Sequence, residues 1–397
     1  MKRKRKITII SVLLLVILGI IIGNGVYQYN YNKDFYYQST VKKIVDIFDK
    51  NETIDEAAMN FTVYDTASVT KLFFADKSGN QTLLERTDNG WTVNKDYAAN
   101  QFLINQILYT TNRIHIKPMS VKKKDNIVTQ MASTNTKIEV YQRMPRINLF
   151  NKIKLFYHET RSRVYYVGGV TQDNTGTYVL KEGGNNVYVA YLPALNGSIS
   201  SRFTANALDW RSHIIFNSKM NEIASVKLEI NRDPANSFII NEIGRTQYSM
   251  TRLNGEPVDY SDNKVLTLMT SFQDVRFEAF LNDIDPIRRD SVINSPFEQR
   301  LTVTTKDGKS RTVTTYSMLP NADMFDYDPN VVNDPNFYDG ITDPDHQYAL
   351  LSEGNEFVLI QKFVFGKLLK PAYYYDKNYR DEFKQIYYKE LETIESY

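Results

Sequence analysis

The architecture is set by the stretch Ala67-Ser-Val-Thr-Lys-Leu-Phe-Phe74, which leads through Asp76-Lys-Ser-Gly-Asn80 into Gln81-Thr-Leu-Leu-Glu-Arg86. Apolar and polar residues alternate along both flanking segments, as they do in strands with one buried face. The glycine in the connecting turn supplies the positive φ that a tight hairpin needs. The pattern predicts an antiparallel β-hairpin at the start of a folded domain.

The residues after this hairpin predict a third strand and a helix. Asp88-Asn-Gly90 turns the chain into Trp91-Thr-Val93, and Asp96 is placed to cap a helix that runs through Asn112. Apolar side chains recur in that helix at helical spacing. Trp91 and Trp210 are predicted to anchor the core rather than to form binding platforms.

The second half of the chain repeats this order of segments. Ala224-Ser-Val-Lys-Leu-Glu-Ile230 matches the first strand, with Ser225-Val226 lying 157 residues after Ser68-Val69. Further on, the segment 178–189 matches 348–359 at an offset of 170. Two ordered matches predict an internal duplication, with chance similarity between hairpin-rich proteins as the alternative.

The N-terminus predicts a membrane anchor. The run from Ile7 to Tyr27 is almost wholly aliphatic up to Ile22 and would span roughly 30 Å as a helix, about one hydrocarbon thickness. Five basic residues precede it, so the positive-inside rule keeps the N-terminus in the cytoplasm and exports the rest. A cleaved signal peptide and a buried core helix are the alternatives. The later apolar segment 357–365 is β-branched and aromatic and predicts a strand.

These patterns together predict an α+β protein at the bacterial cytoplasmic (inner) membrane, single-pass, with an extracytoplasmic body. Its N-terminal transmembrane helix precedes two β-rich repeats, with mainly antiparallel sheets that each pack helices. The expected divisions are a cytoplasmic basic segment 1–6, an anchor 7–27, a stalk 28–54, repeat one at 55–218, repeat two at 219–375 and a charged C-terminal helix 376–397.

Charge and composition exclude several classes of function. The formal net charge of the 397 residues is +2, and without the five basic residues at the N-terminus it is −3. The exported part is therefore not a basic nucleic-acid binder. Because the chain has no cysteine, disulfides, thiolate metal sites and a cysteine nucleophile are excluded.

A search for catalytic motifs identifies no catalytic or cofactor-binding residue. His158-Glu159 begins a zincin-like pattern, but Ser162 stands where the second histidine is needed. Neither a Gly-x-Ser-x-Gly elbow nor a phosphate-binding glycine loop occurs in the sequence. Gly168-Gly169 and Gly176 flank a turn that is either a binding turn or a β-turn with glycine at positive φ. The other histidines are His115, His213 and His346.

One acidic loop is a weak calcium candidate. Oxygen-rich loops can supply the six to eight oxygens that Ca²⁺ prefers. The spacing of an EF-hand is absent, so a solvated, proline-stiffened loop is the favoured interpretation. The candidate ligands are Asp326, Asp328, Asp334, Asp339, Asp343 and Asp345.

A set of short segments, in order along the chain, carries a family resemblance. They are Asp65-Thr-Ala-Ser-Val-Thr-Lys71, Leu84-Glu85 with Trp91, Tyr165-Tyr-Val-Gly-Gly169, Thr175-Gly-Thr-Tyr178, Asp209-Trp-Arg211 and Phe357-Val-Leu-Ile360. The chain resembles an uncharacterised bacterial membrane-anchored family, the domain of unknown function four-three-four-zero, over roughly residues 60–375. The resemblance implies an anchor followed by exported β-rich repeats, no known activity, and association with transporter components. The segment from Arg143 to Lys154 stands out as a local addition.

The expected function is that of a membrane-tethered interaction or scaffold protein of a cell-envelope assembly, associated through the resemblance with an ABC-type transporter. No enzymatic activity is expected. The expected partners are the lipid bilayer, through Ile7 to Tyr27, and envelope proteins, but no nucleic acid. The alternative is an exported enzyme or carrier acting on envelope polysaccharide or lipid, since glycosidase carboxylates are defined by geometry rather than by sequence spacing.

Overall fold

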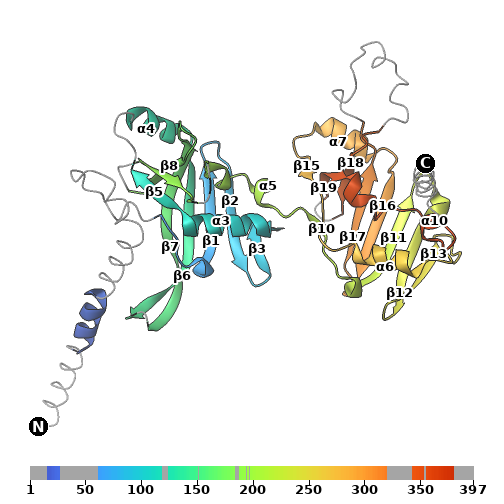
Figure 1. The fold of residues 1–397 in the computed structure, drawn as a ribbon, viewed down its shortest axis with the longest axis horizontal. Helices are drawn as coiled ribbons and strands as arrows, with labels where there is room; N and C mark the ends of the chain where they lie inside the picture. Colours follow the sequence, from blue (N-terminus) through green and yellow to red (C-terminus); the bar gives the residue numbers. More distant parts are fainter. Residues whose placement is uncertain are drawn as a thin grey trace, which may run out of the picture. The chain divides into compact units, whose positions relative to one another are not determined.

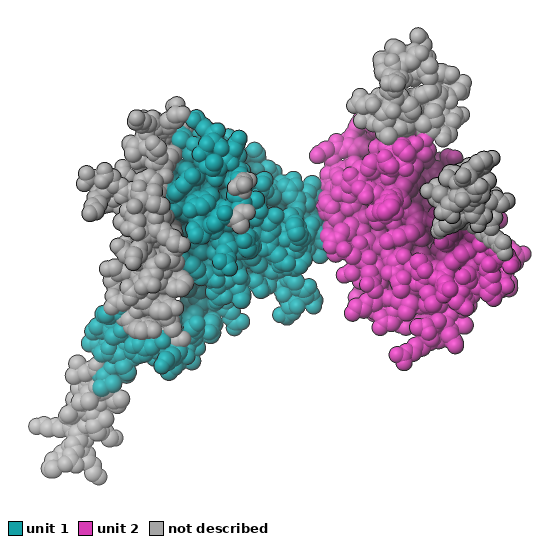
Figure 2. All heavy atoms as spheres, viewed as in Figure 1, with its two compact units in different colours: residues 1–212 teal, residues 213–397 magenta. Residues whose placement is uncertain are grey.

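The chain folds into two compact units, residues 1–212 and 213–397. They are shown as a ribbon in Figure 1 and in two colours in Figure 2. The sequence placed the division six residues later, at 218/219. The computed structural model describes residues 16–26, 61–118, 124–150, 152–183, 187–193, 195, 197–319, 342–352 and 355–379.

The first unit is built on a nine-stranded antiparallel sheet with strand order β4-β3-β2-β1-β6-β7-β8-β9-β5. The alternation in the predicted hairpin has its expected consequence, because Leu72 lies opposite Leu84 and both are fully buried. The elements are η2 (Thr66–Ser68), β1 (Val69–Asp76), β2 (Gln81–Thr87), β3 (Gly90–Val93), β4 (Tyr97–Ala98), α3 (Gln101–Arg113), β5 (His115–Pro118), α4 (Lys124–Ser133), β6 (Thr136–Leu149), β7 (Ile153–Val170), β8 (Thr177–Lys181), β9 (Val187–Tyr191), η4 (Ser200–Arg202) and α5 (Ala207–Trp210).

The second unit is built on an eight-stranded antiparallel sheet with strand order β13-β12-β11-β16-β17-β18-β19-β15, beside the two-stranded pair β10-β14. The elements are β10 (Ile214–Phe216), η5 (Met220–Glu222), β11 (Ile223–Ile230), η6 (Pro234–Asn236), β12 (Phe238–Gly244), β13 (Gln247–Arg252), α6 (Asp262–Thr270), β14 (Val275–Arg276), β15 (Ala279–Phe280), α7 (Pro286–Ile293), β16 (Gln299–Thr305), β17 (Ser310–Tyr316), β18 (His346–Leu351), β19 (Glu356–Gln361), α9 (Lys362–Phe365) and α10 (Ala372–Tyr375).

The two sheets share one strand order once the short edge strand β4 is set aside, so the two units are topologically equivalent. The register shows which residues correspond. β1 and β11 have the same burial pattern. Val69 is the first residue of β1 and Ile223 the first of β11, and the pairing of each strand with its neighbour shifts register just after that residue. These two residues are 154 apart, so the expected match of Ser68-Val69 with Ser225-Val226 is wrong by three positions. The offset of 157 holds at the next pair of anchors, Trp91 and Tyr248, because the turn before β12 is longer.

Each sheet is covered on both faces by apolar contacts. In β9, Tyr188 and Ala190 face the main core with α3, while Val187 and Val189 pack with Ile127 and Met131 of α4. Opposite faces of one strand are therefore buried, which explains its continuous apolar sequence. In the second unit, α6 packs into the main core and α7 covers the cluster around Tyr316, Tyr348 and Phe357.

The expected core tryptophans are confirmed. Trp210 is 2% exposed and stacks on Phe74 at 5.2 Å, while Trp91 is 7% exposed. The expected helix start is wrong, because residues 97–98 form β4 and Asn100, not Asp96, caps α3. The short strand β4 pairs with β3, and Ala99 then forms a bridge to Arg211 before the helix begins.

Two further expectations meet the structure only in part. The predicted strand over 357–365 ends at Gln361, where the chain turns into α9. Residues 16–26 of the predicted anchor are helical. Among the described residues, no helix has both the length and the apolar character needed to cross a membrane. The start of the anchor, the predicted stalk and residues 380–397 lie outside the described residues.

Candidate functional site

The hairpin of β6 and β7 extends well beyond the sheet of the first unit. β6 and β7 have 14 and 18 residues, whereas their counterparts β16 and β17 have seven each. The pairing of β1 with β6 ends at Gln142, and its counterpart in the second unit ends at Thr305, where the short turn 306–309 begins. Residues 143–160, called the arm from here on, are therefore an insertion into a repeated hairpin, and Figure 1 shows them in green curling away from the sheet.

One face of the arm is apolar. Cross-strand partners in an antiparallel ladder project from the same face, and partners two residues further along share it. The register pairs Pro145 with Tyr157, Ile147 with Leu155 and Leu149 with Ile153. Four apolar side chains of this face are 39% to 52% exposed, namely Ile147, Ile153, Leu155 and Tyr157.

The alternate positions of the arm carry basic and amide side chains together with Met144 and Phe156. Arg146 and Asn148 alternate with the apolar residues on β6, Lys154 does so on β7, and Lys152 lies in the turn just before β7. Residues 143–158 contain four Lys or Arg side chains and no Asp or Glu, and the arm's one carboxylate, Glu159, lies at its base. The arm is thus an amphipathic hairpin whose charged side chains between residues 143 and 158 are all positive.

The tip of the arm contacts the N-terminal segment. The backbone N–H of Phe150 donates a hydrogen bond to the side-chain oxygen of Asn24 at 2.8 Å. Phe150 and Phe156 have φ of 52° and 57°, a region that bulky residues rarely adopt. Phe156 is 69% exposed and Phe150 is 43% exposed. The strained backbone therefore accompanies two exposed aromatic rings, and Phe150 is the one whose backbone bonds to the N-terminal helical segment.

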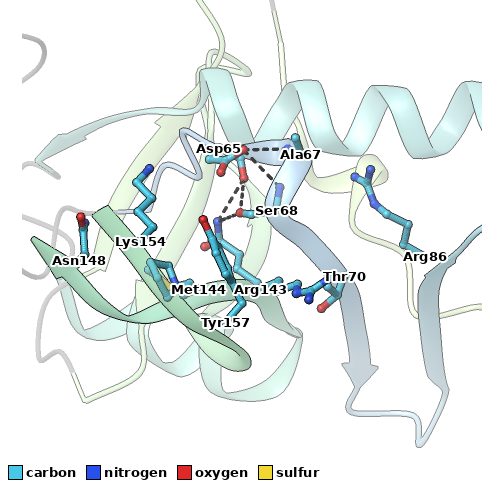
Figure 3. Close-up of a pocket in the computed structure, with 12 residues that line it drawn as sticks. Asp65, Ala67, Ser68, Thr70, Arg86, Arg143, Met144, Asn148, Lys154 and Tyr157 are labelled. Carbon is cyan, nitrogen blue, oxygen red and sulfur yellow. Dashed lines mark hydrogen bonds between the residues drawn. The ribbon is translucent and has the colours of Figure 1, made fainter. Parts of the chain in front are cut away.

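A pocket of about 660 Å³ lies at the base of the arm. Figure 3 shows Lys154 and Asn148 reaching it from the arm, while Asp65 and Ser68 come from the segment that enters β1. The remaining lining residues are Ala67, Thr70, Arg86, Gln142, Arg143, Met144, Pro145 and Tyr157.

The polar groups that line this pocket form hydrogen bonds within its wall. The carboxylate of Asp65 accepts the backbone N–H groups of Ala67 and Ser68 at 3.1 and 3.2 Å. The Gln142 amide donates to the Ser68 hydroxyl at 2.8 Å, and that hydroxyl donates to the Asp65 carbonyl at 2.8 Å. Ser68 is paired with an amide and a carbonyl rather than with a general base, so it lacks the partner that activates a nucleophile. Arg86, which stacks over Trp91, adds positive charge.

A charged cluster on the sheet fixes the strands from which the arm extends. Glu139, whose side chain is 9% exposed, contacts Lys137 at 2.6 Å and Arg161 at 3.2 Å, and it accepts the Tyr141 hydroxyl at 2.5 Å. Burial raises the pKa of Glu139, but the Lys137 and Tyr141 contacts outweigh it and leave that pKa below the ordinary 4.5. At the base of the arm, Glu159 bridges to Lys71 at 3.0 Å.

In the second unit, a histidine lies between two carboxylates. His346 Nε2 is 3.1 Å from Glu278, and its Nδ1 is 3.3 Å from Asp343. Asp343 is buried and accepts the backbone N–H groups of Asp345 and His346. Burial raises the pKa of Asp343, but these backbone donors outweigh it and lower that pKa. The carboxylate is thus committed to forming the turn into β18.

This geometry bears on the calcium candidates. Asp343 and Asp345 lie at the turn just described, whereas Asp326, Asp328, Asp334 and Asp339 lie outside the described residues. In the part of the chain that the structure describes, no group of three or more His, Asp or Glu side chains is placed to hold a metal ion.

The other residues singled out by the sequence are dispersed. His158 lies on the arm, where Nδ1 is 3.0 Å from the Met144 carbonyl, and His213 stacks on Phe277 at 4.5 Å. His115 lies on β5 near Tyr191. The four histidines therefore occupy separate elements and form no joint site among the described residues.

The expected role of glycine in the turn after β7 is wrong. Asn174, with φ of 56°, takes the positive-φ position there, and none of the flanking glycines does. Gly176 is needed for close packing instead, since a Cβ on it would lie 2.9 Å from the Ala190 carbonyl oxygen. Gly168 is packed in the same way against Met131 of α4.

The fold and the arm define an α+β protein of two topologically equivalent sheet units, the first of which carries an amphipathic hairpin. Residues 117–291 match the family described as Domain of unknown function (DUF4340), which confirms the predicted resemblance over that part of the chain. The match runs from β5 to α7 and includes the arm. The rest of the expected range, residues 60–116 and 292–375, lies outside it. No curated protein and no solved structure matches the chain.

Proposed function

We propose that this protein is a membrane-tethered, extracytoplasmic interaction protein of the cell envelope. Residues 7–27 are the proposed anchor, with the N-terminus in the cytoplasm, and the two sheet units are the exported binding modules. A scaffold role beside an ABC-type transporter is part of the proposal and rests on the family resemblance. Tethering raises the local concentration of the units near membrane partners.

The arm is the observation that carries this proposal. Monomeric proteins rarely expose large contiguous apolar patches unless these bind something. The described part of the arm exposes Met144, Ile147, Phe150, Ile153, Leu155, Phe156 and Tyr157 by 39% to 69% each. The equivalent hairpin of the second unit has no such extension, so the arm is not required by the fold.

The absence of cysteine makes a topology experiment direct. Single cysteines are introduced at Lys77 in the β1–β2 turn, at Lys309 in the β16–β17 turn and at Lys4. We expect a membrane-impermeant maleimide to label the first two in intact spheroplasts, and the third only after the membrane is disrupted. Labelling of Lys4→Cys alone, or recovery of the chain in the soluble fraction after carbonate extraction, would contradict the proposal.

The interaction role needs its own measurement. The full chain is purified from detergent-solubilised membranes after mild crosslinking, beside a variant in which residues 143–160 are replaced by Lys-Asp-Gly-Lys, the turn of the second unit. We expect envelope proteins to co-purify with the tethered chain above the background of untagged membranes. Recovery of background proteins alone would count against a scaffold.

A further inference from the structure

We propose that the arm lies in the headgroup region of an anionic phospholipid bilayer, with its apolar face toward the acyl chains and its cations on the lipid phosphates. This deepens the proposed function, on which it rests, by naming the surface that the exposed hairpin contacts. The inference is carried by the two faces of the arm, by its charge and by its contact with the N-terminal segment.

The distribution of side chains fits an interface between water and hydrocarbon. An amphipathic element with an apolar face and a Lys/Arg-rich polar face lies in the plane of the membrane surface. In the arm the apolar face is formed by the pairs Ile147–Leu155 and Leu149–Ile153, while Arg146 and Lys154 alternate with these residues and Lys152 lies in the connecting turn. The inward-facing backbone groups pair across the hairpin, whereas the outward-facing N–H and C=O groups of its two edges need water or lipid headgroups as partners. This places the arm in the headgroup region and not in the hydrocarbon core.

The size of the arm also fits. The seven residues from Arg143 to Leu149 extend roughly 23 Å at about 3.3 Å per residue. That is more than twice the depth of about 5–10 Å to which interfacial elements are buried. The arm therefore lies along the surface rather than across the bilayer, with the exposed rings of Phe150, Phe156 and Tyr157 at the level where aromatic side chains favour the interface.

Charge selects the kind of lipid. Four cations within 16 residues, with no carboxylate among them, favour phosphatidylglycerol or cardiolipin over zwitterionic lipid. A protein partner would need an acidic groove with apolar floor, and the position of the arm favours the bilayer instead. The Phe150 N–H donates to Asn24, four residues from the start of the predicted stalk, so the tip lies where the proposed anchor leaves the membrane.

Depth measurements on the full chain test this inference. The chain is reconstituted into vesicles of phosphatidylglycerol and phosphatidylcholine, or of phosphatidylcholine alone, with an environment-sensitive fluorophore on Leu155→Cys. The same label on Lys309→Cys, in the equivalent turn of the second unit, is the control. We expect a blue-shifted emission that spin-labelled lipids quench for Leu155→Cys in the anionic vesicles, and unquenched, water-like emission for Lys309→Cys.

A charge variant gives the expected magnitude. Neutralising three cations in Arg146→Gln/Lys152→Gln/Lys154→Gln should lower the ratio of inserted to exposed arm by about tenfold or more in anionic vesicles, since each basic residue near the surface favours binding. The control Lys77→Gln/Lys95→Gln/Arg113→Gln removes as many exposed cations from the same unit and should leave that ratio unchanged.

The outcomes separate this inference from the proposed function. Water-like emission of Leu155→Cys in both vesicles overturns the inference, and so does protection of that label in native membranes but not in lipid vesicles, which would indicate a protein partner. Insertion into anionic vesicles together with cytoplasmic labelling of Lys77→Cys would uphold the lipid contact and overturn the exported topology.

Discussion

Replacement of Glu139 by Gln should destabilise the first unit, and only that unit. Glu139 is 9% exposed and holds three partners, Lys137, Arg161 and Tyr141, within 3.2 Å. Glutamine keeps the shape and one acceptor oxygen but loses the charge. Buried hydrogen bonds to charged groups contribute about 1.5–3 kcal/mol each. Because the Lys137 and Arg161 side chains are 31% and 45% exposed, water compensates for part of the loss, and we expect a net cost of about 1–2 kcal/mol.

The assay uses the position of the two tryptophans. Trp91 and Trp210 are the only tryptophans of the chain, and both are buried in the first unit, so their fluorescence reports its unfolding alone. Urea unfolding of the full chain in detergent gives the free energy for wild type and Glu139→Gln. Glu182→Gln is the control, because Glu182 is 43% exposed and contacts Arg161 only at 3.5 Å, and it should cost less than about 0.5 kcal/mol.

The same reasoning predicts how the difference in unfolding free energy between wild type and Glu139→Gln changes with pH. Folding lowers the pKa of Glu139 below 4.5, so its stabilising contribution is fully present above the unfolded pKa and is lost as the pH falls through the folded pKa. The difference between wild type and Glu139→Gln should therefore shrink toward zero on acidification. Equal unfolding free energies at pH 7, or a difference that grows as the pH falls, would refute the reasoning.

Five further substitutions, grouped in three tests, examine other parts of the structure. The hydroxyls of Tyr165 and Tyr375 are buried and have no hydrogen-bond partner within the described ranges, and burial raises the pKa of both. Tyr165→Phe and Tyr375→Phe should therefore leave stability unchanged or raise it by up to about 1 kcal/mol in thermal unfolding, and a clear loss would show that the hydroxyls are bonded. Gly176→Ala should cost about 1–3 kcal/mol, because its Cβ would meet Val189 at 2.5 Å, whereas Gly169→Ala, facing only the flexible end of Gln130, should cost less; equal costs would contradict the packing argument. Asp343→Asn should speed hydrogen exchange of the β18 amides near neutral pH, and this effect should vanish as the pH falls through the lowered pKa of Asp343; an effect that persists in acid would rule out the charge as its cause.

Local patterns in the sequence predicted the strands well. The alternation in β1 and β2 placed Leu72 and Leu84 on the buried face, because a period of two leaves only one register that buries both. The buried tryptophans followed from their size and apolar surroundings. In contrast, residues 97–99, which were expected to be helical, pair with β3 and with Arg211, and the contact with Arg211 is one that no local pattern contains.

The candidate site could be identified only once the strand register of the arm was known. The segment from Arg143 to Lys154 stood out in the sequence as an addition, but its two faces emerge only when Ile147 is known to pair with Leu155. The alternation of apolar and basic residues on both strands was the signal that could have identified them. The base of the arm lies at Gln142, the residue that corresponds to Thr305, where the equivalent strand of the second unit ends. This correspondence also requires the sheet register.

The most direct test of a tethered body with a lipid-bound arm separates the two attachments. A protease site is inserted between residues 50 and 51, the full chain is reconstituted into phosphatidylglycerol-containing vesicles, and the anchor is cut away. We predict that the released units stay bound to the vesicles at low salt when the arm is intact. The variant with residues 143–160 replaced by Lys-Asp-Gly-Lys should instead appear in the vesicle-free fraction. Release of both proteins to the same extent would contradict the account.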